Sequence, residues 1–224
     1  MTLILNIETG GPTCSVCLSA NGILIKERKE IIPNKHAAIL TVLIQELLAE
    51  TGYSIQQIDA IAISKGPGSY TGLRIGTAIA KGLCFTADKP LIAVSSLQSL
   101  AWRMRHEATA KNEATFAPLI QARKDAVYYA VFNHKLEEIA TESFGTLGEV
   151  AEHIKKIDNQ PTAGFFNLND TTTALFRTFG IVIVYFEYVS SNGCELAFSK
   201  FEKNLFEDNF LFEPFYMTGF GKNF

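Results

Sequence analysis

The sequence has no excess of basic residues. Its 224 residues include 20 Lys and Arg against 23 Asp and Glu, which gives a formal net charge of -3 at pH 7. Proteins that bind nucleic acid on their own usually carry a basic patch and a high isoelectric point, so we expect any contact with RNA to be shared with a partner protein. The chain also lacks a basic amino-terminal segment followed by an apolar run, and no apolar run approaches the length of a membrane span. We therefore expect a cytoplasmic protein without membrane attachment.

The sequence also lacks the usual ligand sets for a metal ion. Four residues after His36 comes Leu40, and no other histidines have the His-x-x-x-His spacing of a helical metal site. Cys14 and Cys17 form a Cys-x-x-Cys pair, but no second pair exists to complete four ligands. The pair lies in an alternating apolar run typical of a strand, where residues three apart point to opposite faces. We expect buried structural cysteines and no metal site.

Apolar residues make up 47% of the chain, enough for a core, and they fall into two similar series of expected strands and helices. The first series has strands at 3–8, 13–19, 23–31, 58–64 and 91–94, and helices at 36–51, 71–86 and 96–104. The second has strands at 116–122, 127–133, 136–143, 162–166 and 181–188, and helices at 146–157, 170–179 and 194–204. Polar residues 109–113 separate the two. We expect a first lobe of residues 1–108 and a smaller, divergent second lobe of residues 109–224, whose tail could return to the first lobe.

Two copies of one βββαβα plan are typical of the actin, sugar-kinase and Hsp70 superfold, in which nucleotide phosphates lie between two lobes. The sequence therefore predicts a two-lobed α/β fold with duplicated units and mixed sheets. In that superfold the first hairpin normally presents an aspartate to phosphate and metal. Glu8 and Thr9 take that place here, so the carboxylate is kept but its reach differs.

The run from Ser64 to Gly76 contains four glycines and one proline, and it links an expected strand to an expected helix. It does not have the spacing of a P-loop or of a dinucleotide-binding fingerprint. Ser69 or Thr71 could cap the helix that follows. The loop alone fits a phosphate site and a purely structural turn equally well. Candidates for a vestigial phosphate-binding site are Glu8, Thr9, Gly66 and Gly68.

Several of these motifs closely resemble the bacterial TsaB (YeaZ) family of tRNA threonylcarbamoyladenosine biosynthesis subunits. They are Asn6-Ile7-Glu8-Thr9, the block from Asp59 to Gly76, Lys81-Gly82-Leu83 and Val94-Ser95-Ser96-Leu97. The similarity is weaker from Gln121 to Tyr128 and in Glu213-Pro214-Phe215-Tyr216, and it fades between residues 164 and 205. There the expected second glycine loop after a strand is missing, which puts nucleotide contacts of the second lobe in doubt.

The resemblance implies a non-catalytic partner of a larger paralogue, TsaD, which carries the metal and transfers threonylcarbamoyl to an adenosine of tRNA. It also implies the ATPase TsaE in the same assembly, and contact with tRNA only through the complex. Older names for the group mention a glycoprotease. A metallopeptidase needs clustered His and carboxylate ligands and an activated water, and His36 has no partner at Leu40. We expect no peptidase activity and no catalytic residue.

A surface for the partner is expected on two helices of the first lobe. The helix 36–50 is apolar around most of its circumference, and the next helix has small residues at four-residue spacing. Periodicity alone fits equally well with both faces being covered within the chain. Members of the resembled family pair with the catalytic subunit, and self-associate, through these helices, so a homodimer would compete with the heterodimer. The expected contact residues are Leu40, Leu43, Ile44, Leu47, Leu73, Gly76 and Ala80.

The alternative from another class is a small-molecule kinase or ATPase of the same superfold, with phosphates at Glu8, Thr9 and the glycine loop. The sequence offers no evident general base beyond Glu8 and a shortened second lobe. We expect no cofactor of the chain's own, and a nucleotide at a subunit interface is left open. The basic side chains Arg74, Lys81, Arg123 and Lys124 are interpreted as solvated charges rather than contacts to tRNA or to a partner.

Overall fold

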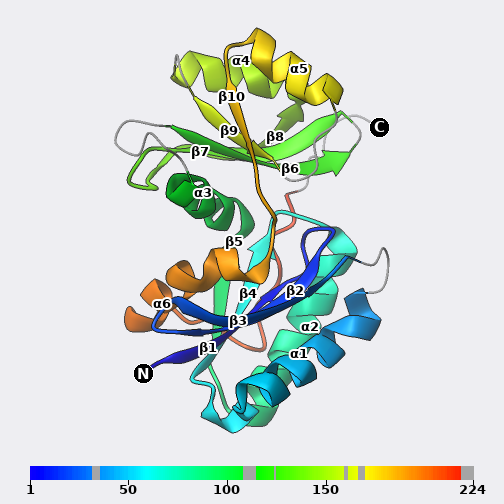
Figure 1. The fold of residues 1–224 in the computed structure, drawn as a ribbon, viewed down its shortest axis with the longest axis vertical. Helices are drawn as coiled ribbons and strands as arrows, with labels where there is room; N and C mark the ends of the chain where they lie inside the picture. The colour runs from blue at the N-terminus through cyan, green and yellow to red at the C-terminus, as the bar shows by residue number, and fades with distance from the viewer. Residues whose placement is uncertain (32–35, 108–114, 124, 159–160, 166–169, 218–224) are drawn as a thin grey trace. The chain divides into compact units, whose positions relative to one another are not determined.

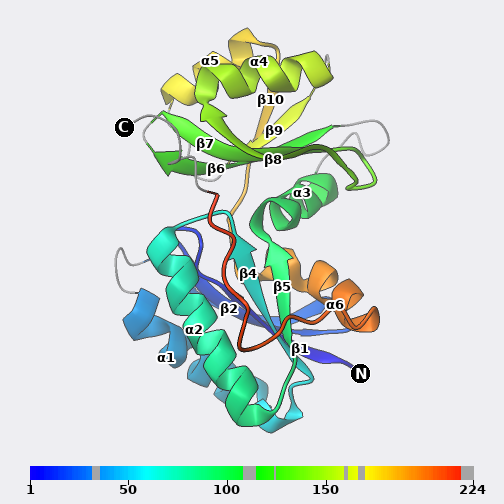
Figure 2. The same cartoon turned by 180° about the vertical axis from the view of Figure 1, so that it is seen from behind.

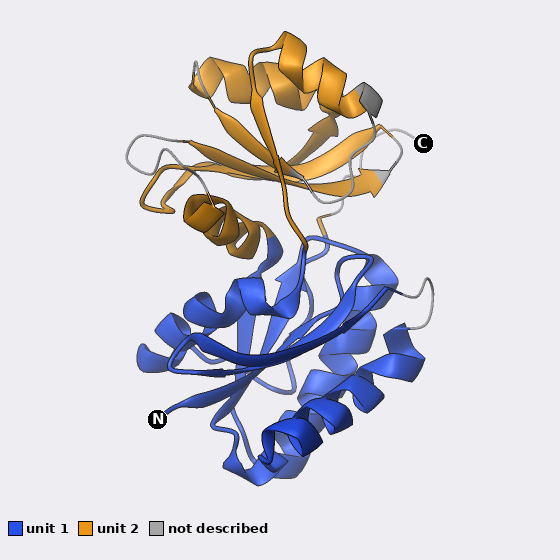
Figure 3. Ribbon diagram, viewed as in Figure 1, with its two compact units in different colours: residues 1–96, 188–216 blue, residues 97–187, 217–224 orange. Residues whose placement is uncertain are grey.

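The computed structural model describes residues 1–31, 36–107, 115–123, 125–158, 161–165 and 170–217. The chain forms two compact units, shown in different colours in Figure 3. Unit 1 comprises Met1–Ser96 and Tyr188–Tyr216, and unit 2 comprises Leu97–Glu187 and Met217–Phe224. The boundary therefore differs from the one expected after residue 108, because the chain leaves unit 1 at Ser96 and returns to it at Tyr188.

Unit 1 is built on a five-stranded mixed sheet of order β3-β2-β1-β4-β5 (Figure 1). The central strand β1 (Leu3–Glu8) pairs antiparallel with β2 (Cys14–Ala20) and parallel with β4 (Ala60–Gly66). The edges are β3 (Ile23–Glu30), antiparallel to β2, and β5 (Leu91–Ser95), parallel to β4. Five strands were expected in these places, so the strand predictions for the first half of the chain are confirmed.

Different helices cover the two faces of this sheet, as Figures 1 and 2 show. The pair α1 (His36–Thr51) and α2 (Tyr70–Ala87) covers one face, and α6 (Cys194–Glu202) covers the other. Because alternate residues of a strand point to opposite faces, Leu5 packs in the core under α1 and α2, while Ile4 packs in the core under α6. The short 3-10 helices are η1 (Ile55–Gln57) and η2 (Ser190–Gly193).

The segment after α6 crosses unit 1 without regular structure. The backbone N–H of Glu207 donates to the carbonyl of Leu91, 2.9 Å away, at the edge strand β5. Phe212 then enters the core under α1 and α2. The tail thus covers a sheet edge that would otherwise be unpaired, and this packing explains why unit 1 needs residues from both ends of the chain.

Unit 2 repeats the same plan. Its sheet order β8-β7-β6-β9-β10 corresponds to β3-β2-β1-β4-β5 of unit 1, with the same parallel and antiparallel pairs. The elements are α3 (Ser96–Glu107), β6 (Phe116–Arg123), β7 (Ala126–Phe132), β8 (Glu138–Thr146), α4 (Leu147–Ile157), β9 (Thr162–Phe165), α5 (Asp170–Thr178) and β10 (Val182–Tyr185). The expected duplicated fold is confirmed.

The helices of unit 2 also follow the sequence closely. At the start of α4, Thr146 and Glu149 form the expected capping box, with the Thr146 N–H donating to the Glu149 carboxylate at 2.9 Å.

Across the residues described in both units, no helix is both long and apolar enough to cross a membrane.

Candidate functional site

The glycine loop packs directly against the turn between β1 and β2. The Ser69 N–H donates to the carbonyl of Gly10 at 2.7 Å. A Cβ on Gly68 would lie 2.7 Å from the same Gly10 oxygen, and a Cβ on Gly72 would overlap the carbonyl oxygen of Thr9. At either position a side chain would collide with the backbone of the turn. Glycine is therefore required at both positions for α2 to approach β1. Close packing within the chain, the structural alternative for this loop, accounts for Gly68 and Gly72.

The amide groups at the start of α2 are used within the chain. Ser69 is the N-cap: its hydroxyl accepts a hydrogen bond from Gly72 N–H at 3.2 Å, and its carbonyl accepts one from Leu73 N–H at 2.9 Å. The prediction that Ser69 or Thr71 caps this helix is therefore confirmed for Ser69. The donors that could hold a phosphate at a helix N-terminus are in part occupied by these bonds.

Glu8 is buried at the end of β1 and is held by hydrogen bonds. The Gly10 N–H donates to Glu8 Oε1 at 2.6 Å, and the Ser64 hydroxyl donates to Glu8 Oε2. Burial raises the pKa of Glu8 from 4.5 to about 7, although these hydrogen bonds act in the opposite direction. Burial and the charge of Glu8 also raise the pKa of Tyr188. Glu8 is thus a buried carboxyl group that titrates near neutral pH.

The four candidate phosphate-binding residues lie near one another around this turn; three of them are buried and Gly68 is half-buried. Glu8 and Thr9 are buried. Gly68 lies against Gly10, and Gly66 is covered by the carbonyl of Phe215 from the tail. In unit 2, Gly164 at the end of β9 is covered by Met104 and Phe186, and the residues after Phe165, where a second glycine loop was expected, lie outside the described residues.

The structure places the expected partner-contact residues inside unit 1, which corrects that prediction. Leu40, Leu47, Leu73 and Ala80 are buried, and Leu43 and Ile44 are only 4% and 6% exposed. Gly76 is also buried, against Thr9 and Ile63. The leucines and isoleucine of α1, and Ala80 of α2, pack in the same core as Leu5, because the largest apolar side chains gain most from covering the sheet. These residues therefore hold the fold together and are not available to a partner.

Several small residues are exposed on the same two helices, among charged and larger side chains. On α1 they include Ala38, Val42 and Ala49, and on α2 they include Ala78 and Gly82. We call these five residues the small-residue face. A neighbouring helix can approach closely where side chains are small, so this face has the geometry that had been expected of Gly72, Gly76 and Ala80.

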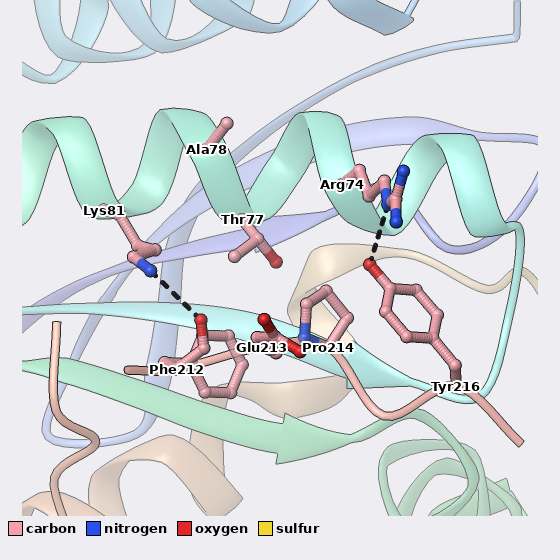
Figure 4. A pocket seen from close by; sticks show the side chains of 8 residues that line it. All are labelled: Arg74, Thr77, Ala78, Lys81, Phe212, Glu213, Pro214 and Tyr216. Atoms are coloured by element: carbon pink, nitrogen blue, oxygen red, sulfur yellow. Dashed lines mark hydrogen bonds between the residues drawn. The ribbon is translucent and has the colours of Figure 1, made fainter. Parts of the chain in front are cut away.

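A pocket of about 430 Å³ lies between α2 and the tail (Figure 4). It is lined by Arg74, Thr77, Ala78, Lys81, Phe212, Glu213, Pro214 and Tyr216. The tail is fixed on both sides of the pocket: Lys81 Nζ donates to the carbonyls of Phe210 and Phe212 at 3.0 and 3.1 Å, and Phe215 N–H donates to the carbonyl of Lys65 at 2.7 Å. The pocket is thus built from two segments of unit 1 that are far apart in the sequence.

Arg74 stands at one end of this pocket between two tyrosines. Its Nε donates to the Tyr216 hydroxyl at 3.2 Å, and its guanidinium lies 4.1 Å from the centre of the Tyr70 ring. The hydrogen bond to Tyr216 raises the pKa of Arg74, so the guanidinium stays charged. Arg74 and Lys81 are therefore not simply solvated charges, because both bind the tail. The side chain of Arg123, and Lys124, lie outside the described residues.

Sequence reasoning missed the pocket because Phe212 and Tyr216 are distant from α2 in the sequence. A usable signal was the density of aromatic residues between Phe206 and Tyr216 in a segment with no helical or strand pattern. Among the described residues, no three His, Cys, Asp or Glu side chains lie close enough together to hold a metal ion.

The known proteins that resemble this chain have names from the same tRNA modification. Residues 25–219 match the family model described as TsaD, tRNA N6-adenosine threonylcarbamoyltransferase. The chain is 38% identical to the tRNA threonylcarbamoyladenosine biosynthesis protein TsaB of Escherichia coli, over 58% of this chain and 54% of that protein. It is 32% identical to TsaB of Bacillus subtilis, over 69% of this chain and 67% of that protein. The matches thus span between about half and two thirds of these curated relatives.

Solved structures extend the similarity over the whole chain. YeaZ from Pseudomonas aeruginosa superposes with a TM-score of 0.79 and 25% identity, covering 97% of this chain and 100% of that one. A ROK hexokinase from Thermus thermophilus superposes with a TM-score of 0.54 and 11% identity, covering 90% of this chain and 100% of that one. The hexokinase shows a shared fold alone.

Proposed function

This chain belongs to the TsaB (YeaZ) family of tRNA threonylcarbamoyladenosine biosynthesis proteins, and we propose that it is the non-catalytic, activating subunit that pairs with a TsaD-like threonylcarbamoyltransferase. In this proposal the transferase carries out the chemistry on tRNA, a TsaE-like ATPase joins the same assembly, and tRNA is met only through the complex. The chain acts in the cytoplasm and has no cofactor of its own. A nucleotide, where one is bound, lies at a subunit interface.

The observation that carries the non-catalytic role is the packing around Glu8. A kinase or ATPase of this fold needs room beside the first hairpin for phosphate and an accessible carboxylate. Here Gly68 and Gly72 lie against the backbone of Thr9 and Gly10, and Glu8 is buried and accepts hydrogen bonds from Ser64 and Gly10. The chain's own atoms fill the space that a phosphate would need.

The surface proposed for pairing is the small-residue face of α1 and α2. Val42 is 47% exposed and Gly82 has no atom of another residue within 4 Å of where its Cβ would be. A partner helix could therefore lie close to the α2 backbone there. The same face would support self-association, so homodimer and heterodimer would compete for it.

The test is co-expression with the host's catalytic paralogue, followed by mass measurement with light scattering on a sizing column. We expect a one-to-one heterodimer with the wild-type chain. Val42→Glu and Ala78→Glu place a charge on the small-residue face and should abolish pairing, while circular dichroism of each variant stays native. Ala174→Glu, a charge on an exposed alanine of α5 in unit 2, is the matched control and should still pair.

Two results would contradict the proposal. One is that the wild-type chain and the paralogue elute as separate species at concentrations well above those in the cell. The other is steady ATP hydrolysis by the purified chain alone, which would favour the kinase or ATPase alternative.

A further inference from the structure

We propose that the pocket between α2 and residues 212–216 receives an acidic side chain of the partner protein, and that Arg74 is the group that binds its carboxylate. Tyr70 and Tyr216 act as positioning residues that hold the guanidinium. This inference rests on the proposed pairing and names the chemistry of one contact within it.

Arg74 is charged and held in place, and it feels the negative charge of Glu213 without forming an ion pair with that carboxylate. None of the described carboxylates forms an ion pair with it, and among the described residues its one hydrogen bond is the bond from Nε to Tyr216. The two terminal nitrogens are therefore free to donate. A carboxylate accepts two parallel hydrogen bonds from a guanidinium, which is the geometry that arginine recognises best.

Arg74 is also held in place before any ligand binds. The Tyr70 ring lies under the guanidinium at 4.1 Å and is itself 4.8 Å from the ring of Tyr216. A free arginine side chain loses conformational entropy when it binds, and two aromatic contacts with one hydrogen bond have already restricted Arg74. Figure 4 shows the guanidinium held above Tyr216 beside the pocket. Binding a carboxylate there costs less ordering than at an unrestrained surface arginine.

The charge of the pocket also favours an acidic ligand. Arg74 and Lys81 lie seven residues apart on α2, about 10 Å along the helix axis, and Glu213 is the one acid among the lining residues. Lys81 donates to two tail carbonyls, which leaves one of its three protons. The pocket thus has an excess of positive charge, although the whole chain has a net charge of -3.

The surroundings of the pocket favour a protein as its ligand. Exposed aromatic side chains lie near the pocket: Phe85 is 70% exposed and in ring contact with Phe210, which is 77% exposed. Aromatic residues and arginine are enriched in the centres of protein interfaces. Ala78 belongs both to the pocket lining and to the small-residue face, so the two surfaces are continuous. RNA binding would instead need several phosphate-binding cations, and this pocket offers two.

The experiment measures the affinity of the purified full-length chain for the host's catalytic paralogue by titration calorimetry at low and moderate salt. Arg74→Gln should weaken binding about tenfold or more, the amount expected for lost hydrogen bonds to a charged group, and should reduce the salt dependence. Tyr216→Phe keeps the ring but removes the hydroxyl, and should weaken binding about threefold. Lys156→Gln, an exposed lysine of α4 in unit 2, is the matched control and should have no effect.

A positioning role for Tyr216 also predicts the affinity of the double variant. In the Arg74→Gln background, Tyr216→Phe should have no additional effect, because its hydroxyl would act only through Arg74. A scan of Asp and Glu to Ala in the paralogue, each combined with Arg74→Gln, should find one carboxylate whose loss is not additive with the loss of Arg74.

The outcomes separate the two proposals. If Val42→Glu abolishes pairing but Arg74→Gln and Tyr216→Phe leave the affinity unchanged, the pocket proposal is wrong and the pairing stands. If the wild-type chain does not bind the paralogue, both are wrong. If Arg74→Gln weakens binding of the chain to host tRNA while the affinity for the paralogue is unchanged, Arg74 binds phosphate and the pocket proposal is again wrong.

Discussion

Glu8 is a carboxyl group whose ionisation should make the stability of the protein depend on pH. Its pKa is raised from 4.5 to about 7 by burial. Below pH 4.5 the group is protonated in both the folded and the unfolded chain, so it does not lower the free energy of unfolding. Between pH 4.5 and 7 the unfolded chain loses the proton first, so the free energy of unfolding falls as pH rises, by about 3 kcal/mol in total. Above pH 7 the penalty is constant.

Glu8→Gln tests this dependence, because an amide fills the same space and does not ionise. We expect the variant to be more stable than the wild type at pH 8, by up to about 3 kcal/mol, and similar to it near pH 4.5. Urea unfolding at several pH values measures the difference. Glu152→Gln, at an exposed position of α4, should show no such pH-dependent gain. A Glu8→Gln difference that stays the same across the pH range would contradict the assignment.

The four cysteines should be unreactive in the folded protein. All are buried as free thiols, which confirms the burial predicted for the pair Cys14 and Cys17, and the Sγ atoms of Cys17 and Cys194 lie 3.4 Å apart. Burial raises the pKa of Cys14 and of Cys84 to about 12, so little of the reactive thiolate is present at neutral pH. We expect Ellman's reagent to detect no thiol in the native protein and all four in guanidinium chloride. Fast reaction of any one thiol before unfolding would show that its surroundings open easily.

At the scale of the element, two glycines of α2 should respond in opposite directions to the same substitution. Ala is a better helix former than Gly by about 1 kcal/mol. Gly82→Ala adds a methyl group in open space, so we expect a gain of about 0.5–1 kcal/mol. Gly72→Ala would drive a methyl group into the carbonyl of Thr9 and force α2 away from β1, for a net loss of about 2–4 kcal/mol. Urea unfolding of both variants gives the comparison, and a stabilised Gly72→Ala protein would rule out the tight packing.

Elements were well predicted from the sequence, but the faces of α1 were not. Spacing and capping residues such as Thr146 act locally, so the helix and strand positions could be read from short windows. The helix 36–51 is apolar nearly all round, and its pattern alone does not say which apolar side chains meet the sheet. Leu43 and Ile44 turned out to be core because large side chains favour burial, while the smaller Ala38 and Ala49 remain outside. The choice depends on neighbours such as β1 and β2, which a pattern does not contain.

The glycine loop and the pocket could be predicted only in part, because local patterns can be read from the sequence and tertiary contacts cannot. Ser69 and the two glycines that lie against the first hairpin belong to a compact block with a local signature, so the sequence located the loop but not whether a phosphate or the chain itself fills it. The pocket beside Arg74 depends on Tyr216, 142 residues away. Contacts of that separation are set by tertiary packing and leave no periodic signal.

At the scale of the whole molecule, the path of the chain sets which fragment can fold alone. Unit 1 uses residues from both ends: Ser190 N–H donates to Ser15 Oγ at 2.8 Å, and Phe212 completes the core under α1 and α2. A fragment of residues 1–108 without the returning tail would lack these partners. Buried polar groups without partners and an unfilled core are both costly.

A shortened chain should therefore fold only if it contains both segments. We expect residues 1–96 joined by a flexible linker to residues 188–216 to unfold cooperatively and to pair with the catalytic paralogue through the small-residue face. Residues 1–108 alone should lack a cooperative transition, because α6, the tail segment that pairs with β5 at Glu207, and Phe212 are missing. Thermal unfolding followed by circular dichroism distinguishes the two chains, and light scattering of each with the paralogue reports pairing. Cooperative unfolding of residues 1–108 would show that the returning segment is an addition to unit 1 and not a part of its core.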